Sequence, residues 1–377
     1  MTCPICKINH SGWIIYSRYL EKYDYQFEIT FCPNCGIVYN PNPEAYHKVI
    51  NDNYCQFTGT NWKSSGLYKQ ALQQRNFIRA NWGATSTNIA LDVGCGNGIL
   101  LSILKEDFNR VRGYEPNKEA RTVAKERTGS VIVDEPMESA KVKMRANDLI
   151  TMSHVLEHVL DPVAFLERAK DLLADNGRIF IEVPDADHPR VMIPPFFVPE
   201  HTFNFNQSSL EMLFCRVGLV PVKIESVNSN PDGGMNYPVI RCLLRVVNNL
   251  APLAFIPSDP KAIFDAYSVA RISLIEELND KINFAGFDQF WVFGTGYHTE
   301  ILLEDMPELV DRIVGFLDNN PAKQKTMYKG KPVLAPDCLL VHECKNMLLS
   351  TIAEGEVLDG LKGKSYFNQL NIVRIYG

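Results

Sequence analysis

Residues 89–98 read Ile-Ala-Leu-Asp-Val-Gly-Cys-Gly-Asn-Gly, and this stretch predicts the fold of the chain around it. The apolar run Ile89–Val93 is typical of a buried parallel strand. It leads into Gly94, Gly96 and Gly98, and a helical pattern of apolar residues follows over 99–104. A strand, a glycine turn and a helix in this order let a ligand approach bare backbone at a helix N-terminus. A dinucleotide-binding turn has the spacing G-x-G-x-x-G, whereas the third glycine comes one residue early here.

Apolar strand patterns alternate with helical patterns downstream of this turn. The second strand, Val111–Asn117, contains Glu115, and a carboxylate there can accept hydrogen bonds from both hydroxyls of a ribose. Further strands are expected over residues 130–133, 148–152, 178–183, 220–227 and 237–247. The last two are expected to form a closing antiparallel pair. The alternation predicts an α/β fold with a doubly wound sheet that binds its ligand at the carboxyl ends of the strands.

Two pairs of cysteines near the N-terminus form C-x-x-C motifs, Cys3 with Cys6 and Cys32 with Cys35. Four thiolates at this spacing predict a zinc ribbon with a closed, non-catalytic tetrahedral site. His10 is a substitute ligand that such a site does not need. Redox or disulfide pairs are the alternative. They are disfavoured because no secretory signal is seen and the other cysteines are scattered singly.

Composition narrows the function classes. The 377 residues, 46% of them hydrophobic, are enough to bury two or three cores. A net charge of −6 without a long basic run argues against a nucleic-acid partner. Charges or prolines interrupt every apolar stretch before it reaches membrane-spanning length, so no membrane insertion is expected. The ten cysteines suit a reducing cytoplasm, which is the predicted location.

The segment His154-Val155-Leu156-Glu157-His158 follows the fourth strand and has the pattern H-x-x-E-H, which also occurs in zinc proteases. A helix here would place His154 and His158 on one face, where both could bind a metal. No third ligand is apparent nearby in the sequence. The favoured interpretation is that His154 lines the ligand pocket, while Glu157 and His158 orient or cap the loop.

A second strand–glycine turn–helix pattern lies towards the C-terminus. The strand Phe290–Phe293 runs into Gly294 and Gly296, and the strand after it ends at Asp318. The third glycine of a full dinucleotide fingerprint is missing. The pattern therefore predicts a Rossmann-like lobe that either carries the substrate or binds no nucleotide of its own.

Proline-rich residues 251–260, followed by an expected helix over Lys261–Asn283, indicate a boundary before this lobe. The predicted domains are a zinc-binding ribbon (1–50), a linker and helix (51–84), a ligand-binding domain (85–249), a second linker and helix (250–285) and the C-terminal lobe (286–377).

The glycine turn, with Asp92 just before it, resembles that of the class I S-adenosylmethionine (SAM) methyltransferases. The resemblance implies SAM as the ligand, with Asp92 facing its ammonium group and Glu115 holding its ribose. The stretch after the third strand, which contains Met137, would lie by the adenine. The residues implied in SAM binding are Asp92, Gly94, Cys95, Gly96, Gly98, Glu115, Pro116, Met137, Ser153 and His154.

The order of ribbon, SAM fold and Rossmann-like lobe resembles the sugar C-methyltransferase family of bacterial deoxysugar and surface-glycan pathways. The resemblance implies methyl transfer from SAM to a carbon next to the carbonyl of a nucleotide-linked keto sugar. In that family a histidine from a Glu-His segment after the fifth strand removes the proton, and the matching residues here are Glu200 and His201. A histidine suits proton abstraction near neutrality, and Glu200 could fix its tautomer. The pair could instead simply close the loop before the helix expected over Ser208–Cys215.

Two positions depart from the family pattern. Val198 stands where the sugar enzymes carry an aromatic hydroxyl. Asp232–Asn236 replaces a Gly-Gly-Ser-x-Arg segment, and an arginine follows only at Arg241. O-methylation of a sugar or another small-molecule hydroxyl therefore stays open, as does a non-catalytic SAM-binding scaffold. The predicted catalytic residues are His201, Glu200 and His154.

Overall fold

The computed structural model describes residues 1–20, 24–44, 66–82, 89–134, 137, 145–193, 195–229, 237–247 and 259–377. The chain divides into two compact units. The first consists of Met1–Pro189 and Phe197–Phe264, and the second of Arg190–Phe196 and Asp265–Gly377. The five-part division made from the sequence stays a prediction.

A seven-stranded sheet forms the centre of the first unit, with the order β10-β11-β8-β7-β4-β5-β6. Its strands are β4 (Ile89–Val93), β5 (Arg110–Tyr114), β6 (Val131–Val133), β7 (Asn147–Ser153), β8 (Leu173–Pro184), β10 (Leu219–Asn228) and β11 (Pro238–Val246). Strands β6, β5, β4, β7 and β8 are parallel, whereas β11 and β10 close the edge antiparallel. The chain reverses its direction of progress across the sheet between β4 and β7, where such folds bind their ligands. The predicted doubly wound α/β class is confirmed.

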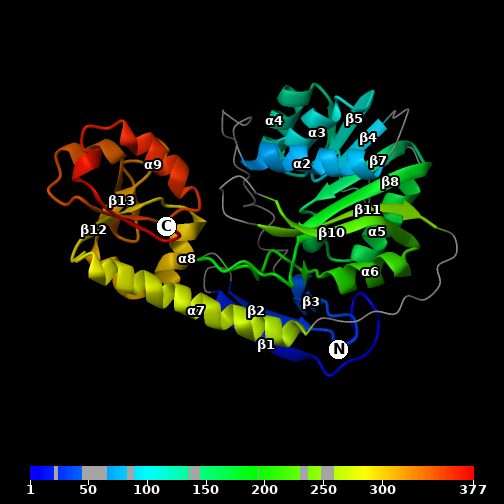
Figure 1. Cartoon of the computed structure of the whole chain (residues 1–377), viewed down its shortest axis with the longest axis horizontal. Coiled ribbons are helices and arrows are strands. Elements are labelled where there is room, and N and C mark those ends of the chain that lie inside the picture. The colour runs from blue at the N-terminus through cyan, green and yellow to red at the C-terminus, as the bar shows by residue number, and fades with distance from the viewer. Residues whose placement is uncertain are drawn as a thin grey trace. The chain divides into compact units, whose positions relative to one another are not determined.

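Helices cover both faces of this sheet (Figure 1). They are α2 (Gly66–Asn81), α3 (Ile99–Leu104), α4 (Lys118–Thr128), α5 (Pro162–Leu172) and α6 (Gln207–Arg216). One core joins α2, α3 and α4 to strand residues such as Leu149 and Phe180, and the other joins α5 and α6 to residues such as Ile150 and Ile181. Consecutive side chains of a strand point to opposite faces, so an unbroken apolar run fills both cores.

The N-terminal residues form a small sheet with the order β1-β2-β3-β9. Its strands are β1 (Trp13–Leu20), β2 (Tyr25–Phe31), β3 (Val38–Tyr39) and β9 (Phe203–Asn204). Strand β9 comes directly after the loop that carries His201 and Thr202. It pairs antiparallel with β3, and Asn40 N donates to Thr202 O over 3.0 Å. The cysteine-bearing segment is thus hydrogen-bonded to the loop that contains His201.

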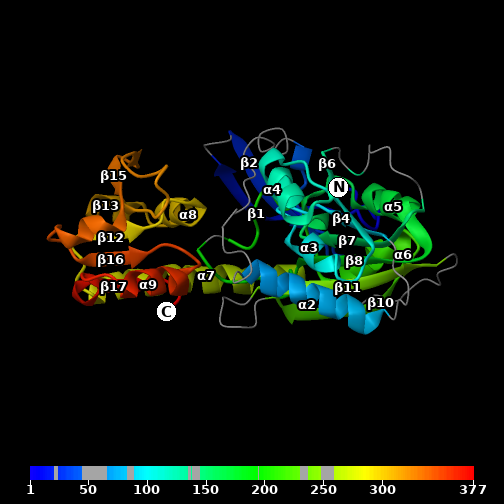
Figure 2. The ribbon, with the colours of Figure 1, turned by 90° about the horizontal axis from the view of Figure 1, so that it is seen from above.

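The second unit has its own sheet with the order β14-β15-β13-β12-β16-β17. Its elements are α7 (Pro260–Phe284, which begins in the first unit), β12 (Phe290–Phe293), α8 (Tyr297–Asp305), β13 (Ile313–Leu317), β14 (Met327–Tyr328), β15 (Lys331–Leu334), β16 (Asn346–Leu349), α9 (Glu354–Lys362) and β17 (Asn371–Arg374). All pairs except β14 with β15 are parallel, as in a Rossmann fold (Figure 2). Short 3₁₀ turns occur at η3 (Leu156–His158), η4 (Pro307–Arg312), η5 (Pro336–Leu340) and η6 (Phe367–Gln369). Among the described residues, no helix has the length and apolar character needed to cross a membrane.

Candidate functional site

The glycine turn after β4 has a backbone that only glycine suits. Gly94, Gly96 and Gly98 have φ angles of 68°, 51° and 76°, in the left-handed region that L side chains rarely adopt. A Cβ atom on Gly94 would stand 2.5 Å from a methyl group of Val155, and one on Gly98 would stand 3.0 Å from Ala124 Cα. The three glycines therefore bring the turn close to the segment after β7 and to α4.

Asp92 and Glu115 bring two carboxylates to this turn. Asp92 is buried at the end of β4, and its Oδ1 accepts a 2.6 Å hydrogen bond from Thr151 Oγ1. Burial raises the pKa of Asp92 to about 7, since the nearby charge of Glu115 adds to the effect and the Thr151 hydrogen bond only partly opposes it. A carboxyl group in this state is stabilised in its charged form by a ligand cation.

Glu115 reaches across from the end of β5 to the glycine turn. Its Oε2 accepts a 2.8 Å hydrogen bond from Gly96 N, and its Oε1 accepts one of 2.8 Å from Asn117 N. Burial raises the pKa of Glu115, although both hydrogen bonds favour the charged form. The structure thus places together the acidic residues and the turn that the sequence analysis selected.

Of the other residues implied in SAM binding, Cys95 lies within the turn, and Pro116 directly follows Glu115. Cys95 is buried, and its N–H donates to Tyr114 O over 3.0 Å. The carbonyl of Pro116 accepts from Arg121 Nη1 over 3.0 Å, which holds the start of α4. Met137 is buried, and its carbonyl accepts from Arg168 Nε over 3.3 Å. The rest of the stretch expected beside the adenine, residues 135–136 and 138–139, lies outside the described residues.

Ser153 and His154 stand at the carboxyl end of β7, next to β4 in the sheet. Ser153 Oγ accepts a 2.7 Å hydrogen bond from Gln74 Nε2. His154 has a φ of 55°, so the chain leaves the strand through a left-handed residue. The helix considered for the H-x-x-E-H segment is therefore wrong, because His154 is not helical and only Leu156–His158 form a 3₁₀ turn. His154 and His158 do not share a helix face.

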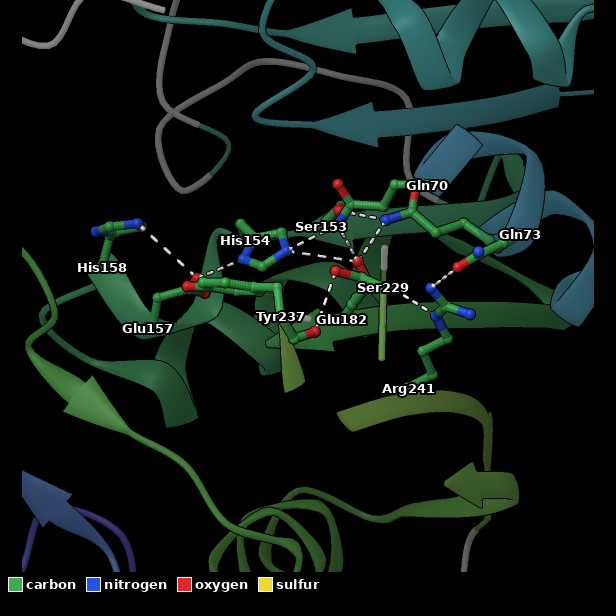
Figure 3. A network of polar contacts seen from close by, with 11 residues as sticks. Gln70, Gln73, Ser153, His154, Glu157, His158, Glu182, Ser229, Tyr237 and Arg241 are labelled. Atoms are coloured by element: carbon green, nitrogen blue, oxygen red, sulfur yellow. Dashed lines mark hydrogen bonds and ion pairs between the residues drawn. The ribbon is translucent and has the colours of Figure 1, made fainter. Parts of the chain in front are cut away.

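The ring of His154 lies between two buried carboxylates (Figure 3). His154 Nδ1 is 3.3 Å from Glu157 Oε1, and its Nε2 is 3.4 Å from Glu182 Oε1. Burial by itself would lower the pKa of His154, but these two carboxylates outweigh it and raise the pKa to about 10. The ring also packs against Tyr237, with 5.7 Å between the ring centroids.

The sequence analysis missed Glu182 as a site residue. Glu182 is fully buried in β8, where it accepts hydrogen bonds from Gln70 Nε2 at 2.6 Å, from Gln74 Nε2 at 2.7 Å and from Arg241 Nε. Burial raises its pKa, but His154 and Arg241 outweigh this and lower the pKa to about 2. A charged residue inside the apolar run Ile-Phe-Ile-Glu-Val was the available signal, because a buried charge needs partners.

His201, the proposed base, lies beside the 3₁₀ turn. Its ring is 5.0 Å from that of His158, measured between the ring centroids. Burial and the neighbouring His158 lower the pKa of His201 to about 3, so the ring is neutral in neutral solution. Glu200 contacts His158 through its backbone carbonyl, which accepts from His158 Nδ1 over 2.8 Å. Within the described part of the chain, the carboxylate charge that acts on His201 belongs to Glu157 rather than to Glu200.

The four N-terminal cysteines converge as the spacing predicts. The four Sγ atoms all lie within 4.8 Å of one another; they belong to Cys3, Cys6, Cys32 and Cys35. The Sγ atoms of Cys3 and Cys35 are 3.7 Å apart, and those of Cys6 and Cys32 are 3.6 Å apart. Sulfurs about 2.3 Å from a tetrahedral zinc ion are about 3.8 Å from one another, so the donor set fits zinc.

The second unit repeats the acid-and-glycine arrangement in a weaker form. Gly294 has a φ of 105°, and Thr295 Oγ1 donates to Asp318 Oδ2 over 2.5 Å. Lys323 Nζ stands 3.4 Å from the same oxygen. Asp318 is therefore already paired. A carboxylate that binds ribose hydroxyls would instead have to be open to the ligand.

The first unit is similar in sequence to known methyltransferases. Residues 67–224 match a protein family described as Methyltransferase domain. The chain is 28% identical over 156 residues to the ubiquinone biosynthesis O-methyltransferase of Xanthomonas campestris, which covers 38% of this chain and 65% of that protein. It is 30% identical over 130 residues to the corresponding enzyme of Vibrio cholerae, covering 32% and 53%. The chain thus spans less than two thirds of the length of these relatives.

Solved structures of methyltransferases are also similar to part of this chain. A SAM-dependent methyltransferase from Leishmania major is 20% identical, with a TM-score of 0.44 over 54% of this chain and 85% of that one. The 1,6-didemethyltoxoflavin-N1-methyltransferase of Burkholderia thailandensis, solved with S-adenosylhomocysteine bound, is 19% identical, with a TM-score of 0.42 over 60% and 98%. Residues 67–224 thus match a methyltransferase domain, and the sheet order and the glycine turn give this part of the chain a Rossmann-like class I methyltransferase fold.

Proposed function

We propose that the protein transfers a methyl group from SAM to a carbon beside the carbonyl of a nucleotide-linked keto sugar. The observation that carries the methyl-donor part is the junction of Asp92, the glycine turn and Glu115 at the switch point of the sheet. SAM has an ammonium group for Asp92 and ribose hydroxyls for Glu115, and it has no phosphate for the helix N-terminus. The sugar acceptor rests on the resemblance of the whole chain described above.

His201 is proposed to remove the proton from the acceptor carbon. The resulting enolate carbon then takes the methyl group that SAM supplies, and S-adenosylhomocysteine leaves. Glu200 holds the neighbouring His158 through its carbonyl, which keeps the loop in place. His154, set at the carboxyl end of β7, lines the pocket between donor and acceptor.

Zinc in the four-cysteine cluster is proposed as a structural ion, because four thiolates leave no open coordination position. No disulfide joins the cysteines of the described residues, which agrees with the proposed cytoplasmic location. The Rossmann-like lobe is proposed as a substrate lobe, although its Asp318 is already paired with Thr295 and Lys323.

O-methylation is a second candidate, and the names of the curated relatives favour it. The test is a panel of nucleotide sugars and small-molecule hydroxyl acceptors, incubated with SAM and analysed by mass spectrometry. Transfer to a keto sugar supports the proposal, and transfer to hydroxyls only contradicts it. A protein that binds SAM but methylates nothing would be the scaffold left open by the sequence.

Replacing His201 separates carbon from oxygen chemistry. His201→Ala is expected to lower the rate of the chemical step by about 10²–10⁴-fold with SAM affinity nearly unchanged, because a base acts on the proton and not on the donor. It should also stop exchange of the acidic acceptor hydrogen into heavy water, even without SAM. Exchange at the wild-type rate in the variant would exclude His201 as the base for carbon.

A further inference from the structure

Glu157, His158 and His201 form a cluster that contains the proposed base together with two residues to which the proposed methyl transfer gives no chemical step. One ligand atom from each lies within 4.8 Å of the other two. Glu157 and His158 come from the 3₁₀ turn after β7, and His201 comes from the loop before β9. The sequence pattern suggested a pair of histidines on a helix, but the structure instead brings a histidine from far along the chain to a Glu-His pair.

Glu157 is the feature of this cluster that needs an explanation. Only 1% of the residue is exposed, yet neither carboxylate oxygen has a hydrogen-bond partner among the described residues. The nearest nitrogen atoms are His154 Nδ1 at 3.3 Å and His158 Nε2 at 3.9 Å, both at ion-pair distance. Buried carboxylates normally accept several hydrogen bonds, because the cost of removing their charge from water is high. A bound cation would add a direct ligand contact to the ion pair that Glu157 makes with His154.

The hydrogen bonding of His158 and His201 leaves a ring nitrogen of each available to bind a metal ion. His158 Nδ1 donates its hydrogen to Glu200 O over 2.8 Å, which fixes the tautomer that leaves the lone pair on Nε2. That Nε2 atom faces Glu157. His201 Nδ1 is buried without a hydrogen-bond partner in the described part of the chain. An imidazole oriented by a backbone carbonyl is the usual second-shell arrangement around a metal.

We propose that Glu157, His158 and His201 bind one divalent transition-metal ion. Two imidazoles and one carboxylate suit Mn²⁺, Fe²⁺, Co²⁺ or Zn²⁺ and leave further coordination positions open. An open coordination position would take an oxygen atom of the acceptor. Only this identification of the additional ligand rests on the proposed function. In the metal-bound protein His201 is a ligand and not the base, so a metal-binding measurement decides between the two roles.

The test uses Mn²⁺, which thiolates bind weakly, so the cysteine cluster does not compete. The full-length protein is titrated with Mn²⁺ without SAM or acceptor, and free Mn²⁺ is measured by electron paramagnetic resonance. The wild type is expected to bind about one ion per chain. Glu157→Gln, His158→Gln and His201→Gln should each bind at least about tenfold more weakly. His188→Gln is the matched control, because His188 is exposed and pairs with Asp185 outside the cluster.

Folding of the variants is checked by their SAM affinity, which depends on the separate Asp92–Glu115 site. If the variants do not fold, paramagnetic broadening in the wild type gives the answer, because the ring signals of His158 and His201 should broaden at a lower Mn²⁺ concentration than that of His188. A wild type that binds no Mn²⁺, or three variants that bind it as tightly as the wild type, would overturn the proposal. Since no methyl acceptor is present, the metal-binding result does not depend on which acceptor the protein methylates, and it decides only whether His201 is a metal ligand or the base.

Discussion

At the scale of single residues, the proposed methyl-donor site contains two buried carboxylates, Asp92 and Glu115, whose surroundings differ. Asp92 has a raised pKa near neutrality and one hydrogen bond, from Thr151. Glu115 accepts hydrogen bonds from two backbone N–H groups, one of them in the glycine turn. The protonation of Asp92 is therefore expected to change when a cationic ligand binds. Glu115 holds the glycine turn through Gly96 N, and its remaining lone pairs can accept hydrogen bonds from ribose hydroxyls.

SAM affinity is expected to depend on pH through Asp92. In the free protein Asp92 has a pKa of about 7, and pairing with the ligand ammonium lowers that pKa in the complex. Binding therefore releases a proton below pH 7, and the association constant should fall by up to about tenfold per pH unit as pH drops from 7 towards 5.5. Calorimetry at several pH values measures this slope. Asp92→Asn should bind weakly with a flatter profile, and an equal slope in both proteins would contradict the assignment.

Glu115→Ala is expected to weaken SAM binding by about 2–3 kcal/mol, because ribose hydroxyls lose a charged acceptor. Glu115→Gln keeps one oxygen acceptor and should lose less. Calorimetry at constant pH measures both affinities. Unchanged affinity in Glu115→Ala would show that the ribose is held elsewhere.

At the scale of elements, the cysteine-bearing N-terminal segment is hydrogen-bonded to the residues that directly follow His201. Strand β3 pairs with β9, and Asn206 Nδ2 donates to Gly36 O over 3.1 Å. Arg216 Nη1 also donates to Ile5 O over 2.7 Å, which ties α6 to the first cysteine pair. Strand β9 begins two residues after His201. Unfolding of the cysteine-bearing segment is therefore expected to displace His201 more than it displaces Asp92 and Glu115.

Cys3→Ser together with Cys32→Ser should abolish zinc binding and lower activity much more than SAM affinity. The protein purified without added zinc is expected to contain about one ion per chain, measured by elemental analysis, and the variant none. Cys215→Ser, outside the cluster, is the control. A metal-free wild type with four titratable thiols would exclude the zinc site.

At the scale of the whole molecule, the two compact units have separate apolar cores. The second unit buries its own aromatic residues, including Trp291 and Phe316, around its parallel sheet. Its glycine turn meets an aspartate that is already paired with Thr295 and Lys323. The units are therefore expected to respond to ligands independently.

Calorimetric unfolding should show two transitions, of which S-adenosylhomocysteine shifts only one. At 100 times its dissociation constant the ligand adds about 2.7 kcal/mol to the stability of the unit that binds it. Trp291 is the one tryptophan in residues 265–377, so Trp291→Phe removes the fluorescence change of the other transition and identifies it. A single transition that shifts as a whole would show that the units unfold together.

Short-range patterns in the sequence determined the strand–glycine turn–helix, the acid at the end of the second strand and the four-cysteine set. Each depends on residues that are close in sequence or on a spacing that one ligand geometry dictates, so strand bounds and donor atoms could be predicted from residue types. The doubly wound class followed because apolar strands that alternate with helices have few ways to pack.

Only the tertiary structure decided the acceptor side. Gln70 and Arg241 meet Glu182 because α2, β8 and β11 pack together in one register, and no local pattern carries that register. His201 reaches Glu157 because a loop folds back between two sheets, and the left-handed backbone of His154 replaces the expected helix. These contacts join residues distant along the chain, and their energies depend on burial that the sequence does not state. For this reason the buried network around Glu182 and the cluster of Glu157, His158 and His201 could not be predicted from the sequence.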